Sequence, residues 1–270
     1  MDTYIPHPCK KNSFANAGDC EVTVRGTISI IIPTLNEERA IAETLNSIPR
    51  SELNAMGYTV EVVVVDGESQ DRTRELAATA GAKVIVEPRK GYGIPIRTGI
   101  YNSDGDIIVK ADGDGTYPLE RLPELVQLFE EEKLDFLSTD RMTNLDHHAM
   151  STRNRLGNKI LLWLVLVLFR LKVKDSQSGM WIITRRAFHP LILETNVTFS
   201  QELKVEAMHF ARLRYDEVPI SYRGRQGKAK FGTIRVGLHA ALALLHLRFR
   251  LRHSRPMTAS GQKASPSMEE

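Results

Sequence analysis

The feature that most constrains the fold is the alternation of strand-like and helix-like segments in the first half of the chain. A β-branched run at residues 28–32 is stopped by Pro33, which is typical of a buried strand. Asn36 is placed to cap the helix that follows it. Further strands are predicted at 60–65, 83–86 and 106–111, and helices at 37–48, 71–80 and 96–101. This order predicts an α/β fold with a Rossmann-like, doubly wound, mostly parallel sheet and flanking helices.

Polar residues gather where these predicted strands end. In open parallel sheets, ligands bind beyond the carboxyl ends of the strands. The polar residues at those ends are Asn36, Glu37, Asp66, Lys90, Asp112 and Asp114. They are therefore the first candidates for a binding site.

The triplet Asp112-Gly113-Asp114 has the spacing of a metal site at a strand end. Residues i and i+2 of an extended segment point the same way, so both carboxylates can face one cation. Gly113 between them allows close approach to the backbone. A divalent ion held by one or two carboxylates and substrate phosphates is the usual magnesium or manganese arrangement. The alternative is a plain turn, because Asp and Gly are common turn residues.

The loop around Lys90 precedes a predicted helix, as phosphate-binding loops do. It is not a dinucleotide fingerprint, because Pro95 and Ile96 stand where the third glycine would be sought. The alternative is an ordinary connection with a solvated lysine.

The second half is less regular. Its predicted strands lie at 136–139 and 180–183, and its predicted helices at 122–132, 153–171, 186–193, 201–211 and 236–251. We expect a flexible arm at 1–26, one catalytic domain at 27–235, an amphipathic basic helix at 236–253 and a disordered tail at 254–270.

The charge of the chain is divided unevenly between its halves. Residues 1–140 carry 14 Lys and Arg against 24 Asp and Glu, whereas residues 141–253 carry 20 against 7. This division suggests that metal ions and phosphates meet between the halves. Cys9 and Cys20 form no ligand cluster, so a reducing compartment is the simplest interpretation. We expect no secretory signal, because the opening residues are polar.

Two apolar segments are each followed by basic residues. Residues 160–169 precede Arg170, and residues 236–247 precede Arg248. An apolar helix beside a basic cluster is typical of a segment lying on anionic lipid. The apolar run at 160–169 is too short to span a bilayer, which needs roughly 20 residues. The alternative is two core helices whose basic ends suit the helix dipole.

Four segments in order resemble the inverting family 2 glycosyltransferases. They are 33–38 (PTLNEE), 65–73 (VDGESQDRT), 90–93 (KGYG) with Arg97 and Gly99, and 112–114 (DGD). The resemblance implies a GT-A fold that binds a nucleotide-sugar. It implies that Pro33, Asn36, Glu37, Asp66, Lys90, Asp112, Gly113 and Asp114 bind the donor, and that Asp112 and Asp114 hold the metal, Mg²⁺ or Mn²⁺.

The second half is similar to polyprenyl-phosphate sugar synthases at 175–180 (DSQSGM), 202–207 and 218–220. The usual Arg-x-x-Gly-x-Ser-Lys is shortened here to 225–230 (RQGKAK). The resemblance implies that the acceptor phosphate is bound by basic residues, for which the candidates are Arg141, Arg155, Arg225 and Lys230.

A phosphate acceptor also fits the chemistry of the residues. A hydroxyl acceptor needs a general base, for which Glu202 is the candidate. A phosphate monoester, with a second pKa of about 6, is already ionised and needs only positioning and charge neutralisation. A second alternative is a catalytically silent sugar-nucleotide-binding or membrane-scaffold protein, against which the intact acidic pair argues.

We therefore expect an inverting, metal-dependent hexosyltransferase with a GDP- or UDP-sugar donor and a polyprenyl (dolichyl-type) phosphate acceptor. The expected catalytic residues are Asp112, Asp114, Arg225 and Lys230. We expect peripheral binding to the cytoplasmic face of a membrane and no nucleic-acid partner. Whether a separate integral-membrane protein recruits the chain stays open at this point.

Overall fold

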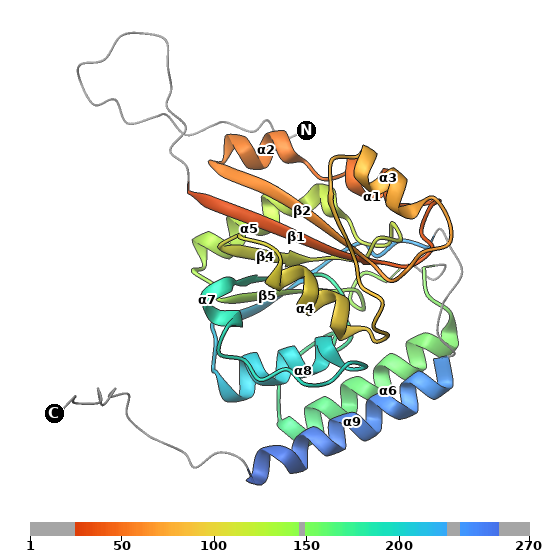
Figure 1. Cartoon of the computed structure of the whole chain (residues 1–270). Coiled ribbons are helices and arrows are strands. Elements are labelled where there is room, and N and C mark those ends of the chain that lie inside the picture. Colours follow the sequence, from red (N-terminus) through yellow and green to blue (C-terminus); the bar gives the residue numbers. More distant parts are fainter. Residues whose placement is uncertain (1–24, 146–148, 226–232, 254–270) are drawn as a thin grey trace, which may run out of the picture.

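A seven-stranded sheet forms the centre of the computed structural model (Figure 1). The structure describes residues 25–145, 149–225 and 233–253. In spatial order the strands are β3 (Lys83–Val86), β2 (Tyr58–Asp66), β1 (Gly26–Thr34), β4 (Ile107–Lys110), β6 (Trp181–Thr184), β5 (Phe136–Asp140) and β7 (Tyr215–Pro219). Strand β6 runs antiparallel to both neighbours, and the other pairs are parallel. The predicted mostly parallel α/β sheet is confirmed.

Helices cover both faces of this sheet. Side chains of β1 alternate between two cores: Ile30 and Ile32 belong to one, and Ile31 belongs to the other. The first core includes residues of α1 (Ile41–Asn46), α2 (Arg50–Ala55), α3 (Thr73–Thr79), η1 (Leu119–Arg121) and α5 (Leu122–Glu131). The second includes residues of α4 (Gly93–Tyr101), α7 (Arg185–Phe188), α8 (Phe199–Val205) and η2 (Glu206–Phe210). Because β1 is buried on both faces, its sequence is a continuous apolar run instead of an alternation of apolar and polar residues.

The long helices α6 (Thr152–Phe169) and α9 (Thr233–His253) lie side by side below this sandwich (Figure 1). They share a third apolar cluster, in which Val165 and Phe169 of α6 pack with Leu244 and Leu247 of α9. The cluster is completed by Val205 at the end of α8. The pair of helices therefore packs against the rest of the domain at the end of α8.

Three local expectations were wrong. The helix expected at 186–193 ends at Phe188. The helix expected at 37–48 begins only at Ile41, and its N-cap is Ala40 rather than Asn36. Asn36 instead has a φ of 49°, and its side-chain oxygen accepts a hydrogen bond from the Gln70 amide at 2.7 Å. Strand β7 was not foreseen, because its sequence, YDEVP, has no clean apolar alternation.

The structure describes α9 from Thr233, so the helix begins before the expected boundary at 235. The predicted arm and tail lie outside the described residues, apart from residues 25 and 26. Among the described residues, no helix combines the length and the apolar character needed to cross a membrane.

Candidate active site

A cavity of about 470 Å³ opens at the carboxyl ends of β1, β2 and β4. We call it the donor cleft. Seven of the predicted site residues line it: Pro33, Glu37, Lys90, Asp112, Gly113, Asp114 and Arg225. Segments far apart in the sequence therefore meet where a doubly wound sheet is expected to bind its ligand.

The acidic loop after β4 lies tightly against the end of β1. A Cβ atom on Gly113 would lie 2.8 Å from Thr34 Cγ2 and 3.2 Å from Ile32 Cγ2. The first of these contacts is closer than real Cβ atoms come, and the second is tighter than most, so packing favours glycine here. The glycine lets the two carboxylates of the loop stand at the strand end without displacing β1.

Asp112 is held by a lysine that the sequence did not single out. Lys110 is fully buried, and its ammonium group donates hydrogen bonds to Asp112 and, at 2.7 Å, to the Tyr92 hydroxyl. Burial alone would lower the pKa of Lys110, but the charge of Asp112 and the contact with Tyr92 hold that pKa above its ordinary value. The lysine therefore stays charged and fixes one acidic ligand at the mouth of the cleft.

Asp114 is more deeply buried than Asp112, with side-chain exposures of 6% and 30%. Its Oδ1 accepts hydrogen bonds from the Thr116 amide at 3.2 Å and the Thr116 hydroxyl at 2.6 Å. Burial, and then the nearby charge of Asp112, raise the pKa of Asp114. A cation bound beside Asp114 would offset this burial and repulsion of its charged form.

Arg225 brings positive charge to this acidic pair. Its Nε lies 3.2 Å from Asp114 Oδ2, and its Nη2 donates to Glu37 Oε1 at 2.9 Å. Burial would lower the pKa of Arg225, whereas Asp114 and Glu37 raise it. The guanidinium therefore links the acidic loop to the segment after β1.

Two predicted donor residues are outside the lining of the cleft. Asp66 is fully buried and accepts hydrogen bonds from the amide and hydroxyl of Ser69 and, at 3.3 Å, from Thr34. Asn36 is joined to Gln70 as described above. Both side chains organise the loops behind the cleft in this structure.

Lys90 projects from the loop after β3 and is 72% exposed. Its ammonium lies 3.2 Å from Glu68 and donates to the Gly67 carbonyl at 3.4 Å. Beside it, Arg89 and Thr98 hold Glu87, whose pKa falls to about 2. The loop thus presents an exposed cation at one rim of the cleft.

The predicted acceptor residues do not all meet at one point. Arg141 is buried and pairs with Asp175 through Nε at 2.7 Å and Nη2 at 3.0 Å. Arg155 lines a separate cavity of about 160 Å³, together with Lys159 and Lys174. Lys230 lies outside the described residues. Of the four candidates, Arg225 lines the donor cleft.

The pairing of Arg141 belongs to a buried polar network that the sequence did not indicate. Burial would raise the pKa of Asp175, but Arg141 lowers it to about 2. Lys204, also buried, donates to the Asp175 carbonyl and to Glu217 at 2.8 Å. Arg141 also stacks on the Tyr222 ring at 5.3 Å, so this network supports one wall of the cleft.

Glu202, the alternative general base, is fully buried in α8. Its carboxylate accepts hydrogen bonds from the Glu194 amide at 3.1 Å and from the Thr195 amide and hydroxyl at 2.7 and 2.8 Å. These bonds tie the loop before α8 to the helix, and Glu202 is not among the residues that line the donor cleft.

Comparison with known proteins identifies relatives of the whole catalytic region. A family model described as glycosyl transferase family 2 matches residues 29–190. A dolichyl-phosphate hexose transferase of Haloferax volcanii is 34% identical over 229 residues, which cover 83% of this chain and 96% of that protein.

Solved structures show the same fold at lower identity. Mannosyl-3-phosphoglycerate synthase from Rubrobacter xylanophilus superposes with a TM-score of 0.69 at 17% identity, covering 88% of this chain and 79% of that one. Glucosyl-3-phosphoglycerate synthase from Mycobacterium tuberculosis, solved with Mn²⁺, UDP and phosphoglyceric acid, gives 0.64 at 22% identity, covering 83% and 78%. The expected GT-A architecture is confirmed, and the chain belongs to glycosyl transferase family 2.

Proposed function

We propose that this protein transfers a hexose, with inversion, from a UDP- or GDP-sugar to the phosphate of a polyprenyl lipid of the dolichyl type. The observation that carries the proposal is the contact of Arg225 with Asp114 in the donor cleft. A cation suited to an acceptor phosphate stands beside a carboxylate suited to a donor's metal. The Haloferax relative, whose length the chain covers almost entirely, supports the same acceptor.

In this proposal the nucleoside and diphosphate lie in the donor cleft against Pro33, Glu37 and Lys90. Lys90 would reach the diphosphate by leaving Glu68, which costs little because both side chains are exposed. Asn36 and Asp66 would act by shaping the loops that line the nucleoside side, since their own side chains bond within those loops.

The acidic loop fits a Mg²⁺ or Mn²⁺ ion. Within the part of the chain that the structure describes, no group of three or more His, Cys, Asp or Glu could hold a metal alone. Asp112 and Asp114 would therefore supply two oxygen ligands, and the donor diphosphate and water the others. When bound, the ion would neutralise the charge that develops on the departing nucleoside diphosphate.

The acceptor phosphate needs positive charge rather than a base. Arg225 would orient it at the cleft, helped by Lys230, and Arg155 would guide it from the separate basic cavity that it lines. Arg141 would act through Asp175 and Tyr222 as a positioning residue, because its guanidinium is already paired.

The alternative acceptor is a sugar or small-molecule hydroxyl, with Glu202 as general base. The three hydrogen bonds that Glu202 accepts from the loop before α8 favour a structural role for it. This is a further reason to prefer an acceptor that arrives already ionised.

The lipid chain of such an acceptor calls for an apolar surface, and the helix pair offers one. Both helices carry an exposed apolar stripe with the same spacing: Leu156, Ile160, Trp163 and Val167 on α6, and Leu238, Leu242, Leu245 and Phe249 on α9. We call these eight residues the apolar face. Neither helix contains Asp or Glu.

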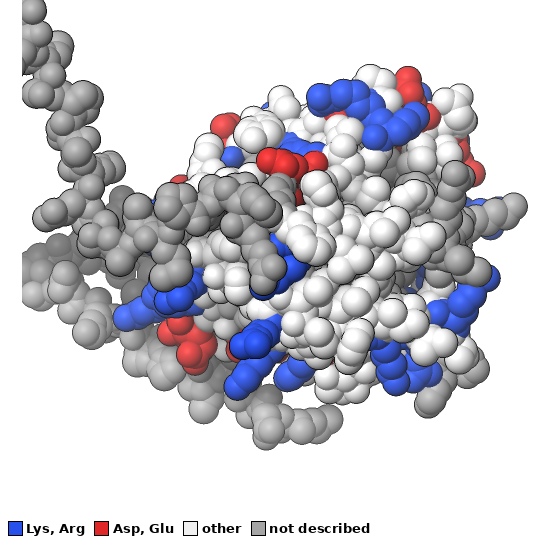
Figure 2. All heavy atoms as spheres, turned by 90° about the horizontal axis from the view of Figure 1, so that it is seen from below, with Lys and Arg blue, Asp and Glu red and all other residues white. Residues whose placement is uncertain are grey.

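Basic residues border this face. Figure 2 shows an area without charged residues that has Lys and Arg at its edges, seen from the side on which α6 and α9 lie. Apolar groups flanked by cations suit the boundary of an anionic membrane. We therefore propose peripheral binding, at the cytoplasmic face given the reducing compartment expected from the cysteines, alone or beside an integral-membrane partner.

The direct test of the acceptor compares a polyprenyl phosphate with the matching polyprenol. Purified protein, Mn²⁺ and a labelled nucleotide-sugar would be incubated with each lipid in detergent. We expect labelled lipid with the phosphate and none with the polyprenol, because the attacking atom is a phosphate oxygen. Labelling of the polyprenol to the same extent would contradict the proposal and favour a hydroxyl acceptor.

A further inference from the structure

A buried lysine stands directly behind the acidic loop. Lys110 is the last residue of β4 and precedes Asp112 by two positions, a spacing that puts both side chains on the same side of an extended segment. The Lys110 side chain has no exposure to solvent, and its ammonium donates hydrogen bonds to Asp112 Oδ1 and to the Tyr92 hydroxyl. A positive charge is therefore enclosed in the wall of the donor cleft, behind a carboxylate that lines it.

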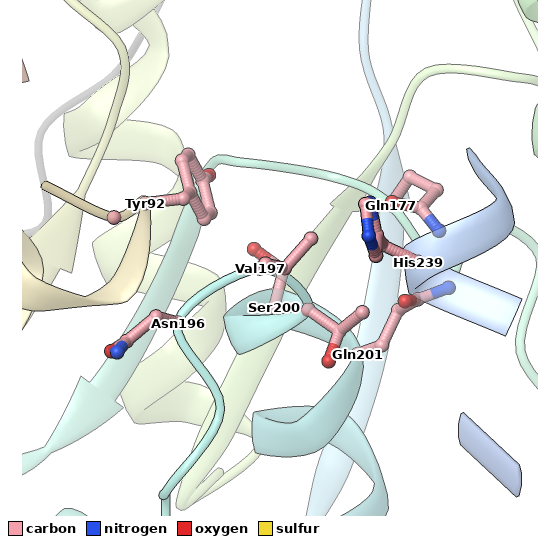
Figure 3. Close-up of a pocket in the computed structure, with 9 residues that line it drawn as sticks. Tyr92, Gln177, Asn196, Val197, Ser200, Gln201 and His239 are labelled. Carbon is pink, nitrogen blue, oxygen red and sulfur yellow. The ribbon is translucent and has the colours of Figure 1, made fainter. Parts of the chain in front are cut away.

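Two neighbours hold this charge in place. The Tyr92 hydroxyl accepts from Lys110 at 2.7 Å, and the ammonium lies 4.9 Å from the centre of the Tyr92 ring. Tyr92 also borders a second cavity of about 330 Å³, where Figure 3 shows it on the side opposite Gln177. A Cβ atom on Gly179 would lie 3.1 Å from Lys110 Nζ and 2.9 Å from Asp112 Oδ2, so the Gly179 backbone closes against the pair. The ammonium is thereby kept out of both cavities.

The cations that line the donor cleft are placed differently. Arg225 is 35% exposed, and Arg89 and Lys90 are 70% and 72% exposed. Exposed ion pairs are weak, so these side chains can leave their carboxylates at little cost. A buried ammonium that lost its carboxylate would keep the cost of desolvation without compensation. Lys110 is therefore a fixed charge, whereas the cations that line the cleft are movable ones.

The ion pairs at the acidic loop involve three carboxylates and two cations. The carboxylates belong to Glu37, Asp112 and Asp114, and the cations to Arg225 and Lys110. Without Lys110, three negative charges would stand against one positive charge. Such an excess attracts a divalent ion and repels the phosphates of a nucleotide. Lys110 therefore makes the loop less attractive to a metal alone and more accessible to a diphosphate.

We propose that Lys110 is a positioning residue that serves as a permanent counter-ion of the acidic loop, so that a nucleoside diphosphate binds in the donor cleft without the metal, which joins it afterwards. Lys110 holds Asp112 through Oδ1 and offsets its charge. The diphosphate and Asp114 then complete the metal site. This inference rests on the proposed function insofar as it takes a nucleoside diphosphate and a divalent ion as ligands of the donor cleft.

The test measures the metal and the nucleotide separately. Binding of Mn²⁺ alone would be followed by the electron paramagnetic resonance signal of the free ion, and binding of UDP and GDP in EDTA by calorimetry. Lys110→Met removes the charge and keeps an unbranched side chain of similar length. We expect Mn²⁺ to bind this variant at least about tenfold more tightly, and the preferred diphosphate at least about tenfold more weakly, because a unit charge a few ångströms away changes ion binding by this order even in a polar medium.

Opposite changes in the two affinities distinguish an effect of charge from a structural defect. A displaced acidic loop would weaken the binding of both ligands and lower the Tm, and that result would overturn the proposal. Lys110→Gln keeps a hydrogen-bond donor and loses the charge, so it is expected to change both affinities as Lys110→Met does. Normal affinities in Lys110→Gln would reduce the role of Lys110 to hydrogen bonding and would also overturn the proposal.

Lys83→Met is the matched control, because it removes the same charge at a distance from the cleft. Lys83 is 52% exposed and begins β3, whose other end leads to the donor cleft. Both affinities of this variant are expected to stay within about twofold of those of the unaltered protein. Equal shifts in Lys83→Met and Lys110→Met would assign the effect to the net charge of the chain and contradict a local role.

Failure of this inference can be told apart from failure of the proposed function. If UDP and GDP bound the unaltered protein only together with Mn²⁺, the proposed order of binding would be wrong, while the donor class would stand. Opposite shifts of the two affinities without any transfer to polyprenyl phosphate would uphold Lys110 as the counter-ion and refute the proposed acceptor. If neither Mn²⁺ nor either nucleotide bound the unaltered protein, alone or together, both proposals would fall.

Discussion

Arg225 Nε lies 3.2 Å from Asp114 Oδ2, and this ion pair fastens the segment after β7 to the acidic loop after β4. Asp114 Oδ1 is already engaged by Thr116, so a cation that binds Asp114 must share Oδ2 with the guanidinium or displace it. A metal bound at Asp114, as proposed, would therefore be coupled to the position of Arg225. A guanidinium released from Asp114 would stand beside the donor diphosphate, where an acceptor phosphate must arrive.

Replacing Arg225 by Ala is expected to lower kcat/KM for transfer to polyprenyl phosphate by about 100-fold, as for the loss of a charged group that stabilises the transition state. Arg225→Lys should recover part of this loss, because it keeps the charge and loses the planar fork. Arg223→Ala is the matched control, since exposed Arg223 pairs with Glu120 at the surface. Steady-state rates with varied lipid would measure the effect, and equal losses in both alanine variants would contradict it.

Asp114→Asn is expected to remove most of the activation by Mn²⁺ while leaving the fold intact. The amide oxygen can still accept from Thr116, and the neutral side chain avoids the two effects that raise the pKa of Asp114, burial first and then repulsion from Asp112. Initial rates over a Mn²⁺ titration would show an apparent affinity at least about tenfold weaker. An unchanged titration curve would place the metal elsewhere.

Glu202→Gln separates the two acceptor classes. We expect activity toward polyprenyl phosphate within about threefold of normal, because no general base is needed. The free energy of unfolding should fall by about 1–3 kcal/mol, because the Glu194 and Thr195 donors lose a charged acceptor. Denaturant unfolding and transfer assays would be run on the same preparation. Abolished transfer with normal stability would instead identify Glu202 as the base.

Asp175→Asn is expected to cost about 3–5 kcal/mol at pH 7, because it leaves the buried Arg141 unpaired. The pKa of Asp175 in the folded protein is about 2, below its ordinary value of 3.8. Its contribution is therefore complete above pH of about 5 and is lost as the pH falls toward 2. Stability measured over this range should fall less steeply in the variant than in the unaltered protein. Parallel curves would contradict the pairing.

Membrane binding is tested on the apolar face. Trp163 and Leu242 are 60% and 55% exposed, so replacing both with Ser should leave the fold stable. The double variant should bind anionic vesicles at least about tenfold more weakly, since each lost side chain contributes about 1.5–3 kcal/mol when buried. Tyr101→Ser is the control, because Tyr101 is 72% exposed on α4, away from this face. Equal vesicle binding by all three proteins in sedimentation assays would refute the membrane role of the face.

The donor cleft could be predicted from the sequence because its residues follow strands with clear runs of β-branched and apolar residues. The run at 28–32 and the triplet at 112–114 both lie where they were expected. Glu37 and Asp114, which follow different strands, both form ion pairs with Arg225. The carboxyl ends of parallel strands lie at one edge of a doubly wound sheet, so the sequence is enough to predict that the residues following them share one site.

The supports of the site were not visible in the sequence. Lys110 was passed over because it belongs to an apolar strand, although it stands two residues before Asp112; its contact with Tyr92 joins separate segments. The pairing of Arg141 with Asp175 joins residues that are distant in the chain. Such contacts depend on the relative placement of β4, β5 and the loop before β6, which periodicity does not determine. A cavity lined by Tyr92, Gln177 and Gln201, among others, was missed for the same reason, since its residues are ordinary polar side chains in separate segments.

The central claim is that a hexose passes from a nucleotide to a lipid phosphate under control of the acidic loop. The most direct measurement incubates purified protein and Mn²⁺ with a panel of labelled UDP- and GDP-hexoses and a polyprenyl phosphate, then counts label in the organic phase. We predict that one donor labels the lipid and that Asp114→Asn abolishes the labelling. Nucleotide-sugar binding without lipid labelling from any donor would contradict the account.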